Sequence, residues 1–263
     1  PADIQVPGVV QYTHMPYDVQ GEQRLKSTLT ELFRIPHRNE VSAIVVGAGP
    51  MGVGITGSLQ VYACEIAHRY GIAPKHVRVE LIEQARKVLP AMDERASEKA
   101  QKRLQKHGVV LRLGNKVTHC TQHVVALGTE ERAADVIIWA AGMELPALFS
   151  KYPEVFTLQS GKVLVDDMLR VPKAPDIHVL GSNAYTAYSG VAQTALYDAV
   201  FVTKLIMGGS GVYRPRNPWT VVPIGERWAL AQKQDKLRSG RMGWAMRSRV
   251  AKRVRSYFKK RIH

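Results

Sequence analysis

Apolar residues alternate along the chain between short runs and helical spacing, and this alternation predicts a β-α-β-α-β unit. The runs Ala43–Val46 and Val77–Ile82 are rich in apolar, β-branched residues, which is typical of strands in a buried parallel sheet. Residues 50 to 69 have the length and spacing of a helix, and Glu94–His107 predicts a second, charge-rich helix. Val109–Leu113 supplies the third strand, so right-handed crossovers would order the sheet.

The segments around this unit have weaker patterns, and each predicts one element. In chain order they predict a helix at Glu22–Phe33, an antiparallel ribbon at Val117–Leu127, a strand at Asp135–Ala141, short strands at Lys162–Val165 and Ile177–Leu180, and a helix at Val191–Leu205. Residues 212 to 223 are rich in proline and are expected to be irregular. Together the elements indicate an α/β fold: a Rossmann-like parallel sheet with an antiparallel ribbon.

A glycine-rich turn joins the first strand to the helix that follows it. Gly47, Gly49 and Gly52 have the Gly-x-Gly-x-x-Gly spacing, and Pro50 begins the helix. The first glycine of that motif permits a tight turn, the second lets the backbone approach a pyrophosphate, and the third lets the helix pack close to the strand. The phosphates would lie against free N–H groups at the positive end of the helix. Loops with this spacing also arise by chance, so the residues around the motif must show whether it binds a nucleotide.

An acidic residue at the end of the second strand supplies that context. Glu83 stands where a carboxylate accepts hydrogen bonds from the adenosine ribose hydroxyls and repels a 2′-phosphate. It follows Gly52 by 31 residues, where about 20 is usual, and the extra length fits an extended helix and loop. The combination predicts binding of NAD(H) in preference to NADP(H). A solvated glutamate at a strand end is the alternative.

Several stretches of the chain resemble the pyridine-nucleotide:flavin oxidoreductases, and within them the type II NADH dehydrogenases. The resemblance is carried by Ile44–Leu59, by Leu81–Glu83 with Val88–Pro90, by Val136–Gly142, and by Pro175–Ala184. It implies a membrane-attached NADH:quinone oxidoreductase in which a hydride passes from NADH to FAD and the flavin reduces a quinone. Because the cofactor carries this chemistry, the resemblance implies binding residues and no catalytic side chain.

The resemblance assigns further cofactor-binding residues. Beside the glycine turn and Glu83, it places Ala141 and Gly142 near the nicotinamide. Gly181 and Ser182 would belong to the second flavin motif, and the helix beside flavin and quinone would begin with Ala192 and Gln193. These residues imply two cofactors, NAD(H) and FAD.

Three departures from the family pattern accompany the resemblance. Ser182 stands where the flavin motif has an aspartate, so any contact with the ribityl chain lacks a charge. Tyr197, Asp198 and Ala199 replace a glutamine pair and a glycine of the quinone pocket. The first flavin-binding β-α-β unit of the family has no counterpart, so the chain is expected to begin after that unit.

The net charge of +15 is concentrated near the C-terminus. Eleven basic residues and no acidic residue follow Asp235, so the first 235 residues carry only +4. Basic residues occupy one face of the last segment, which predicts a basic amphipathic helix for an anionic membrane surface; a helix packed on its own domain is the alternative. The apolar face recurs every fourth residue and consists of Met246, Val250, Val254, Phe258 and Ile262.

The remaining features exclude other classes of site. The two cysteines, Cys64 and Cys120, give no disulfide framework, which suits a reducing compartment. His119, Cys120 and His123 are close in sequence, but neighbouring residues of a strand point to opposite faces, so no metal site is predicted. No run of about 18 apolar residues predicts a spanning helix, and no recognition module for nucleic acid accompanies the basic tail.

These observations divide the chain into four predicted segments. They are a lead-in from a flavin domain (1–40), an NAD(H)-binding Rossmann domain (41–150), the C-terminal remnant of a second, flavin-binding domain (151–210), and a basic amphipathic, membrane-associating tail (211–263). Predicted partners are NADH, a quinone and an anionic membrane surface on the cytoplasmic or mitochondrial-matrix side, with a homodimer left open. Two alternatives stay open: a non-catalytic nucleotide-binding relative with a regulatory role, and a soluble relative that reduces a ferredoxin or a small disulfide.

Overall fold

The computed structural model describes residues 5–16, 19–35, 40–142 and 145–259, apart from the side chains at positions 19, 253, 254 and 257–259. The chain folds as two compact units. The larger unit consists of residues 2–143 and 221–245, and the smaller of residues 1, 144–220 and 246–263. The four predicted segments remain a prediction. They were defined by function, whereas each compact unit combines stretches that are distant in the chain.

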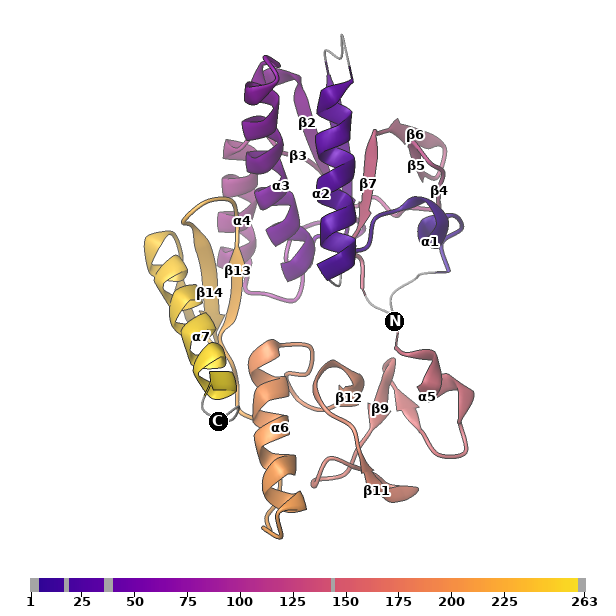
Figure 1. Ribbon diagram of the computed structural model, residues 1–263, viewed down its shortest axis with the longest axis vertical. Helices are drawn as coiled ribbons and strands as arrows, with labels where there is room; N and C mark the ends of the chain where they lie inside the picture. Colours follow the sequence, from indigo (N-terminus) through magenta and orange to yellow (C-terminus); the bar gives the residue numbers. More distant parts are fainter. Residues whose placement is uncertain (1–4, 17–18, 36–39, 143–144, 260–263) are drawn as a thin grey trace. The chain divides into compact units, whose positions relative to one another are not determined.

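A four-stranded parallel sheet forms the centre of the larger unit (Figure 1). Its order is β3 (Val110–Leu113), β2 (Val77–Glu83), β1 (Val41–Val46) and β7 (Val136–Trp139). β1 pairs with β2 from Val41 opposite Val77, and with β7 from Ala43 opposite Val136. The four predicted strands of the Rossmann-like sheet are therefore confirmed, with boundaries shifted by one or two residues.

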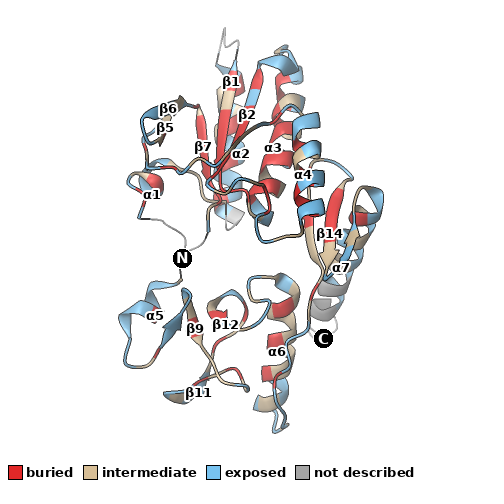
Figure 2. Ribbon diagram, turned by 180° about the vertical axis from the view of Figure 1, so that it is seen from behind, coloured by how far each residue is buried: buried red, intermediate tan, exposed pale blue. Residues whose placement is uncertain are grey.

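Each face of this sheet is covered by a different layer. The helices α2 (Val19–Arg34), α3 (Pro50–Arg69) and α4 (Glu94–Lys106) pack their apolar stripes on one face. The ribbon β4 (His119–Cys120), β5 (Val124–Leu127) and β6 (Glu130–Ala133) covers the other face together with α1 (Val9–Tyr12). Figure 2 shows the buried residues concentrated on the strands between these layers. A short 3₁₀ turn, η1 (Pro74–His76), leads into β2.

The segment expected to be irregular ends in a strand. β13 (Thr220–Pro223) joins β14 (Ala229–Lys233) and β15 (Lys236–Arg238) in an antiparallel sheet. The expectation was wrong for these residues because the prolines at 215 and 218 precede the strand, while Val222 and Ile224 are fully buried. Both side chains join the core beneath α3 and α4.

The hairpin between β13 and β14 is fastened to α4 by one arginine. The guanidinium of Arg103 donates to the carbonyl of Ile224 at 3.4 Å and to that of Glu226 at 3.4 Å. Its Cζ also lies 5.5 Å from the ring centroid of Trp228. These contacts explain why a segment about 120 residues away in sequence belongs to the larger unit.

The smaller unit contains short elements. In chain order they are α5 (Ala147–Lys151), β8 (Leu158–Gln159), β9 (Lys162–Leu164), β10 (Arg170–Val171), β11 (Ala174–His178), η2 (Gly181–Asn183), β12 (Ala184–Tyr185) and α6 (Ala192–Ile206). The last helix, α7 (Arg241–Lys259), continues into this unit from residue 246. The strand expected at Ile177–Leu180 lies earlier, because Pro172 and Lys173 form a tight turn that pairs Val171 with Ala174.

A buried glutamate ties three strands of the larger unit together. Glu80 is only 3% exposed, and its carboxylate accepts from Arg112 on β3 at 2.5 Å and from Arg132 on β6 at 3.1 Å. Arg78 of the same strand forms a further ion pair with it. Burial raises the pKa of Glu80, but the hydrogen bonds from Arg112 and Arg132 and the charge of Arg78 outweigh burial and hold the pKa below its ordinary value.

We expect the Glu80→Gln variant to lose about 3 kcal/mol of unfolding free energy at pH 7, because three arginines then lack their buried counter-ion. The folded pKa lies below the unfolded value of about 4.3. The carboxylate therefore stabilises the fold above that value, and this contribution disappears as pH falls through the folded pKa. Thermal denaturation from pH 7 to pH 3 should show a smaller pH dependence for the variant. Glu22→Gln, which breaks an exposed pair with Lys26, is the control. Equal pH dependence in wild type and Glu80→Gln would contradict the assignment.

Candidate functional site

The glycine turn lies where β1 ends, at the carboxyl edge of the parallel sheet. Gly47 has a φ of +98°, which an L side chain rarely adopts. A Cβ at this position would lie 2.7 Å from Cα of Ala141, which follows β7. The first glycine therefore lets the chain cross directly against the end of the neighbouring strand, where Gly47 and Ala141 lie together.

The other two glycines differ in what surrounds them. A Cβ at Gly52 would lie 1.8 Å from the carbonyl oxygen of Gly47, so only glycine lets α3 pack this close to the turn. A Cβ at Gly49 would meet no atom within 4 Å. Gly49 caps α3 without a side-chain hydrogen bond, and Pro50 occupies the first helical position. Open space beside uncapped helix N–H groups is the environment that a pyrophosphate requires.

Glu83 ends β2 and turns its carboxylate toward the glycine turn. Oε2 accepts from the backbone N–H of Ala48 at 2.6 Å, and Oε1 accepts from that of Ala85 at 2.9 Å. The side chain is 9% exposed, so it is not the solvated strand-end glutamate of the alternative interpretation. This contact could not be predicted from the sequence, because it joins residues 35 positions apart. A carboxylate holds further lone pairs, so a ribose hydroxyl can still donate to it.

A second backbone contact fixes the same turn from the loop after β2. The N–H of Leu89 donates to the carbonyl oxygen of Ala48 at 2.8 Å. Leu89 has a φ of +50° and is fully buried, as is Val88. Both polar backbone groups of Ala48 are therefore bonded, one to Glu83 and one to Leu89. Gly142 follows Ala141 with a φ of +103°. Seven of the predicted residues thus lie at or shortly after the ends of β1, β2 and β7.

The remaining four predicted residues lie in the smaller unit. Gly181 opens η2, and its N–H donates to the carboxylate of Asp198 on α6 at 2.9 Å. Ser182 is exposed, and Ala192 begins α6, whose first turn has no side-chain cap. Gln193 donates from Nε2 to the carbonyl of Trp219 at 2.9 Å. Gly181 and α6 are thus adjacent, since a Cβ at Gly181 would lie 3.1 Å from that of Ala195.

Asp198 is a residue whose role the sequence did not reveal. It is fully buried, and beside the N–H of Gly181 it accepts a hydrogen bond from the hydroxyl of Tyr213. Burial, followed by the hydrogen bond and charge of Asp198, raises the pKa of Tyr213, so its hydroxyl stays protonated. The signal in the sequence is an acid in the middle of a mostly apolar helix.

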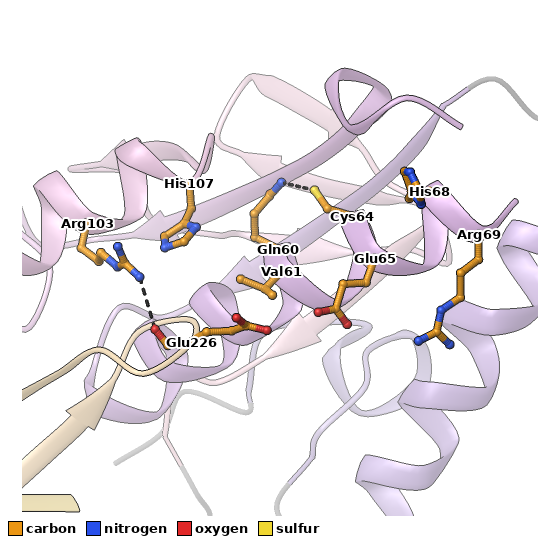
Figure 3. Close-up of a pocket in the computed structure, with 9 residues that line it drawn as sticks. All are labelled: Gln60, Val61, Cys64, Glu65, His68, Arg69, Arg103, His107 and Glu226. Carbon is orange, nitrogen blue, oxygen red and sulfur yellow. Dashed lines mark hydrogen bonds between the residues drawn. The ribbon is translucent and has the colours of Figure 1, made fainter. Parts of the chain in front are cut away.

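Two cavities of the larger unit lie beside α3. One of about 630 Å³ has mostly apolar walls from α2 and the first half of α3, and Pro50 and Met51 border it. The other, of about 710 Å³, lies beside the second half of α3 (Figure 3). In Figure 3 the amide of Gln60 points to Cys64 and Arg103 points to Glu226. No predicted cofactor-binding residue lines this second cavity, so we assign it no nucleotide.

The predicted basic amphipathic helix is present as α7, with its described basic side chains exposed. These are Arg241, Arg247, Arg249, Lys252 and Arg255. Met246 and Val250 of the apolar face are half-buried, while the side chains of Val254 and Phe258 and all of Ile262 lie outside the described residues.

No helix within 5–16, 19–35, 40–142 and 145–259 combines the length and apolar character needed to cross a membrane. In the same ranges, no three His, Cys, Asp or Glu side chains gather closely enough to hold a metal ion.

Trp139 and Cys120 belong to the core of the larger unit. Trp139 is 2% exposed and packs between the sheet and the ribbon. Cys120 is buried in the same cluster, and burial raises the pKa of its thiol to about 11. Its thiol is therefore protonated at neutral pH and serves as an apolar side chain.

The fold and the glycine turn define a Rossmann-type α/β protein, and comparison with known proteins supplies the family. The family model of the pyridine nucleotide-disulphide oxidoreductases matches residues 1–209. The chain belongs to this family.

Individual relatives agree with this result. The mitochondrial external alternative NAD(P)H-ubiquinone oxidoreductase B1 of Solanum tuberosum is 25% identical over 198 residues, which is 69% of this chain and 34% of the relative. A type II NADH:quinone oxidoreductase of Mycobacterium tuberculosis is 33% identical over 177 residues, which is 62% of this chain and 37% of the relative. The chain thus spans about a third of the length of these curated relatives.

A solved structure shows the same fold. NDH2 of Plasmodium falciparum, determined in complex with NADH, superposes with a TM-score of 0.84 at 14% sequence identity. The match covers 95% of this chain and 71% of that chain.

Proposed function

We propose that this chain is the NADH-binding and C-terminal part of a flavin-dependent NADH:quinone oxidoreductase. The observation that carries the proposal is the glycine turn: Gly49 leaves open space at the uncapped start of α3, and Glu83 stands beside it. The relatives whose names state NADH:quinone or NAD(P)H-ubiquinone oxidoreductase activity support it, as does the fold shared with a structure in complex with NADH.

The residues of the larger unit fit NADH. The pyrophosphate would lie over Gly49, against the N–H groups of the first turn of α3. Glu83 would accept hydrogen bonds from the adenosine ribose hydroxyls while it braces Ala48. Ala141 and Gly142, at the end of β7, would lie toward the nicotinamide. The chain's own contribution is therefore to bind and orient the dinucleotide.

The residues of the smaller unit fit FAD less well. The N–H of Gly181 is already bonded to Asp198, and Ser182 offers a hydroxyl where the family motif has a carboxylate. The open first turn of α6 at Ala192 and Gln193 is the remaining feature that suits the cofactor. Bound flavin would supply two-electron transfer from NADH to quinone; the described residues of this unit do not by themselves define its site.

We further propose that α7 attaches the protein to an anionic membrane surface. The exposed Arg249, Lys252 and Arg255 lie on one side of the helix, and half-buried Met246 and Val250 lie on another. Basic side chains near an anionic leaflet contribute about 1 kcal/mol each. This proposal puts the protein at the membrane periphery, on the cytoplasmic or matrix side, where it would meet a quinone dissolved in the bilayer.

The Glu83→Gln variant tests the nucleotide site. We expect the ratio of NADPH to NADH affinity to rise about tenfold, because the carboxylate no longer repels a 2′-phosphate. Isothermal titration of both nucleotides against wild type and variant measures this ratio. Glu94→Gln, which removes an exposed acid paired with Lys87, is the matched control and should leave the ratio unchanged. An unchanged ratio in Glu83→Gln would remove Glu83 from the ribose site, and absence of NADH binding in wild type would remove the proposed function.

A second candidate function is a non-catalytic relative that binds nucleotide and acts through interaction. Ser182 and the bond between Gly181 and Asp198 favour it, because both weaken the flavin side. The whole protein distinguishes the two functions: an enzyme shows flavin absorbance that bleaches on addition of NADH, and a non-catalytic relative binds NADH without that change.

A further inference from the structure

The C-terminal end of α6 carries exposed apolar side chains that no predicted site uses. Ile206 is 74% exposed, Met207 is 82% exposed, and Val212 is 57% exposed. Figure 2 shows this end of the helix and the turn that follows mostly as exposed residues. We call residues 204–216 the α6 tip. Ile206 and Met207 are neighbours in the chain, so they form one small exposed apolar patch, a kind of surface that contacts a partner or a membrane.

The backbone of the α6 tip forms a closed turn. Gly208 has a φ of +84° and donates from its N–H to the carbonyl of Leu205 at 3.0 Å, and Gly209 donates to that of Lys204 at 2.9 Å. A Cβ at Gly209 would lie 2.7 Å from the oxygen of Lys204, so this turn requires glycine. Bonded helix-end carbonyls lower the cost of moving the turn into a less polar environment.

The other end of the tip is anchored to the body of the smaller unit. Tyr213 is buried, its N–H donates to the carbonyl of Asp167 at 2.7 Å, and its ring lies 5.3 Å from that of Phe201. Val212, directly before it, is held outward. The tip is therefore a short projection fixed at both ends, with its apolar side chains in solvent.

The charged residues of the projection's own stretch of chain have one sign. Residues 199–220 include Lys204, Arg214 and Arg216 and no acidic residue. All three cations are exposed, and Arg216 lies 5.7 Å from the ring centroid of Tyr197. Asp198, the acid directly before this stretch, is fully buried. The tip thus combines an apolar end with three exposed cations, and one exposed acid, Asp167, lies at its base, where its carbonyl accepts from Tyr213.

We propose that the α6 tip inserts Ile206 and Met207 into the interfacial region of an anionic lipid bilayer, with Lys204, Arg214 and Arg216 at the phosphates of the headgroups. A lipid surface fits better than a folded partner, because three apolar side chains of one short projection offer far less than the roughly 800 Å² that each side of a stable protein interface buries. Interfacial attachment needs only a shallow apolar insertion with nearby cations. The proposal deepens the membrane part of the proposed function with a second surface, and it does not depend on α7 or on NADH.

Sedimentation with vesicles tests the proposal in the full chain. Wild type and variants are titrated with vesicles of phosphatidylcholine alone and with about 30% phosphatidylserine, an anionic fraction that gives a substantial surface potential. We expect the Ile206→Ser, Met207→Ser double variant to bind the anionic vesicles about tenfold more weakly. We expect the Lys204→Gln, Arg214→Gln, Arg216→Gln variant to lose a similar factor on anionic vesicles and little on neutral ones.

Matched controls come from the same unit. Leu148 on α5 is 55% exposed, and Lys173 is exposed without belonging to the tip, so Leu148→Ser and Lys173→Gln should bind as wild type. Arg249→Gln, Lys252→Gln, Arg255→Gln reports on α7 separately, and NADH titration of every variant reports on the nucleotide site. Wild-type vesicle binding by both tip variants, with unchanged melting temperatures, overturns the proposal. So does a change confined to self-association, which would make the tip a contact between copies of the chain.

Discussion

The Gly52→Ala variant is expected to lose measurable NADH binding and about 3 kcal/mol of unfolding free energy. Its new Cβ would lie 1.8 Å from the carbonyl oxygen of Gly47 and 3.3 Å from Cβ of Ala140. Backbone cannot yield as a flexible side chain can, so the first turn of α3 must move away from β1. The helix N–H groups would then no longer point to the space beside Gly49. Isothermal titration with NADH and thermal denaturation measure the two effects.

Two neighbouring glycines separate the nucleotide effect from the stability effect. Gly49→Ala places its methyl group in open space at a φ of −67°, so the fold should keep its stability. The same methyl group would occupy the proposed pyrophosphate position, and we expect NADH affinity to fall about 100-fold, or about 2.8 kcal/mol. Gly54→Ala meets only an ordinary contact, 3.4 Å from the oxygen of Pro223, and should change neither quantity. Wild-type affinity in Gly49→Ala would show that the pyrophosphate lies elsewhere.

The Asp198→Ala variant is expected to lower the unfolding free energy of the smaller unit by about 4 kcal/mol. The N–H of Gly181 and the hydroxyl of Tyr213 would both lose their acceptor in a fully buried position. Leaving buried donors without a partner costs more than the net value of the bonds themselves. Hydrogen exchange at Gly181 and thermal denaturation would report the loss.

Conservative substitutions at Asp198 and Tyr213 should lower the unfolding free energy by smaller amounts. Asp198→Asn keeps an oxygen acceptor and should cost about half as much, and Tyr213→Phe removes one donor while the bond to Gly181 remains. Asp176→Ala, an exposed acid of the same unit, should stay within about 0.5 kcal/mol of wild type. If Asp198→Ala were as stable as Asp176→Ala, the buried acid would not hold η2 against α6.

Elements were predicted correctly from the sequence where the pattern that defines them lies within the element and its flanking turns. The strands at Val41–Val46 and Val77–Glu83 were predictable because apolar runs between turn signals are local patterns. The strand at Thr220–Pro223 was missed because the prolines dominate the local signal, while burial of Val222 depends on α3 and α4. The hairpin of β10 and β11 was displaced for a similar reason, since its pairing depends on a two-residue turn.

In the candidate site too, residues with a local sequence signal could be predicted, and contacts between distant residues could not. Gly47, Gly49 and Gly52 could be identified by spacing, and the structure confirms their tight packing at positions 47 and 52. The contact between Glu83 and Ala48 and the role of Asp198 could not be predicted, because each joins groups that are distant in sequence. Assignment of the glycine turn and Glu83 to NADH remains a prediction, which Gly49→Ala, Gly52→Ala and Glu83→Gln test.

The two hydrogen bonds of Ala48 have a consequence for the kinetics of nucleotide recognition. Its N–H is held by Glu83 and its carbonyl by Leu89, so the peptide at the centre of the glycine turn is immobilised by the folded protein itself. A glycine-containing loop that becomes ordered only around its ligand loses conformational entropy on binding, and this loss weakens the affinity. Here that entropy is lost during folding, so the cradle is preorganised. Association with a dinucleotide then needs no slow loop closure, and affinity is governed by how fast the ligand leaves.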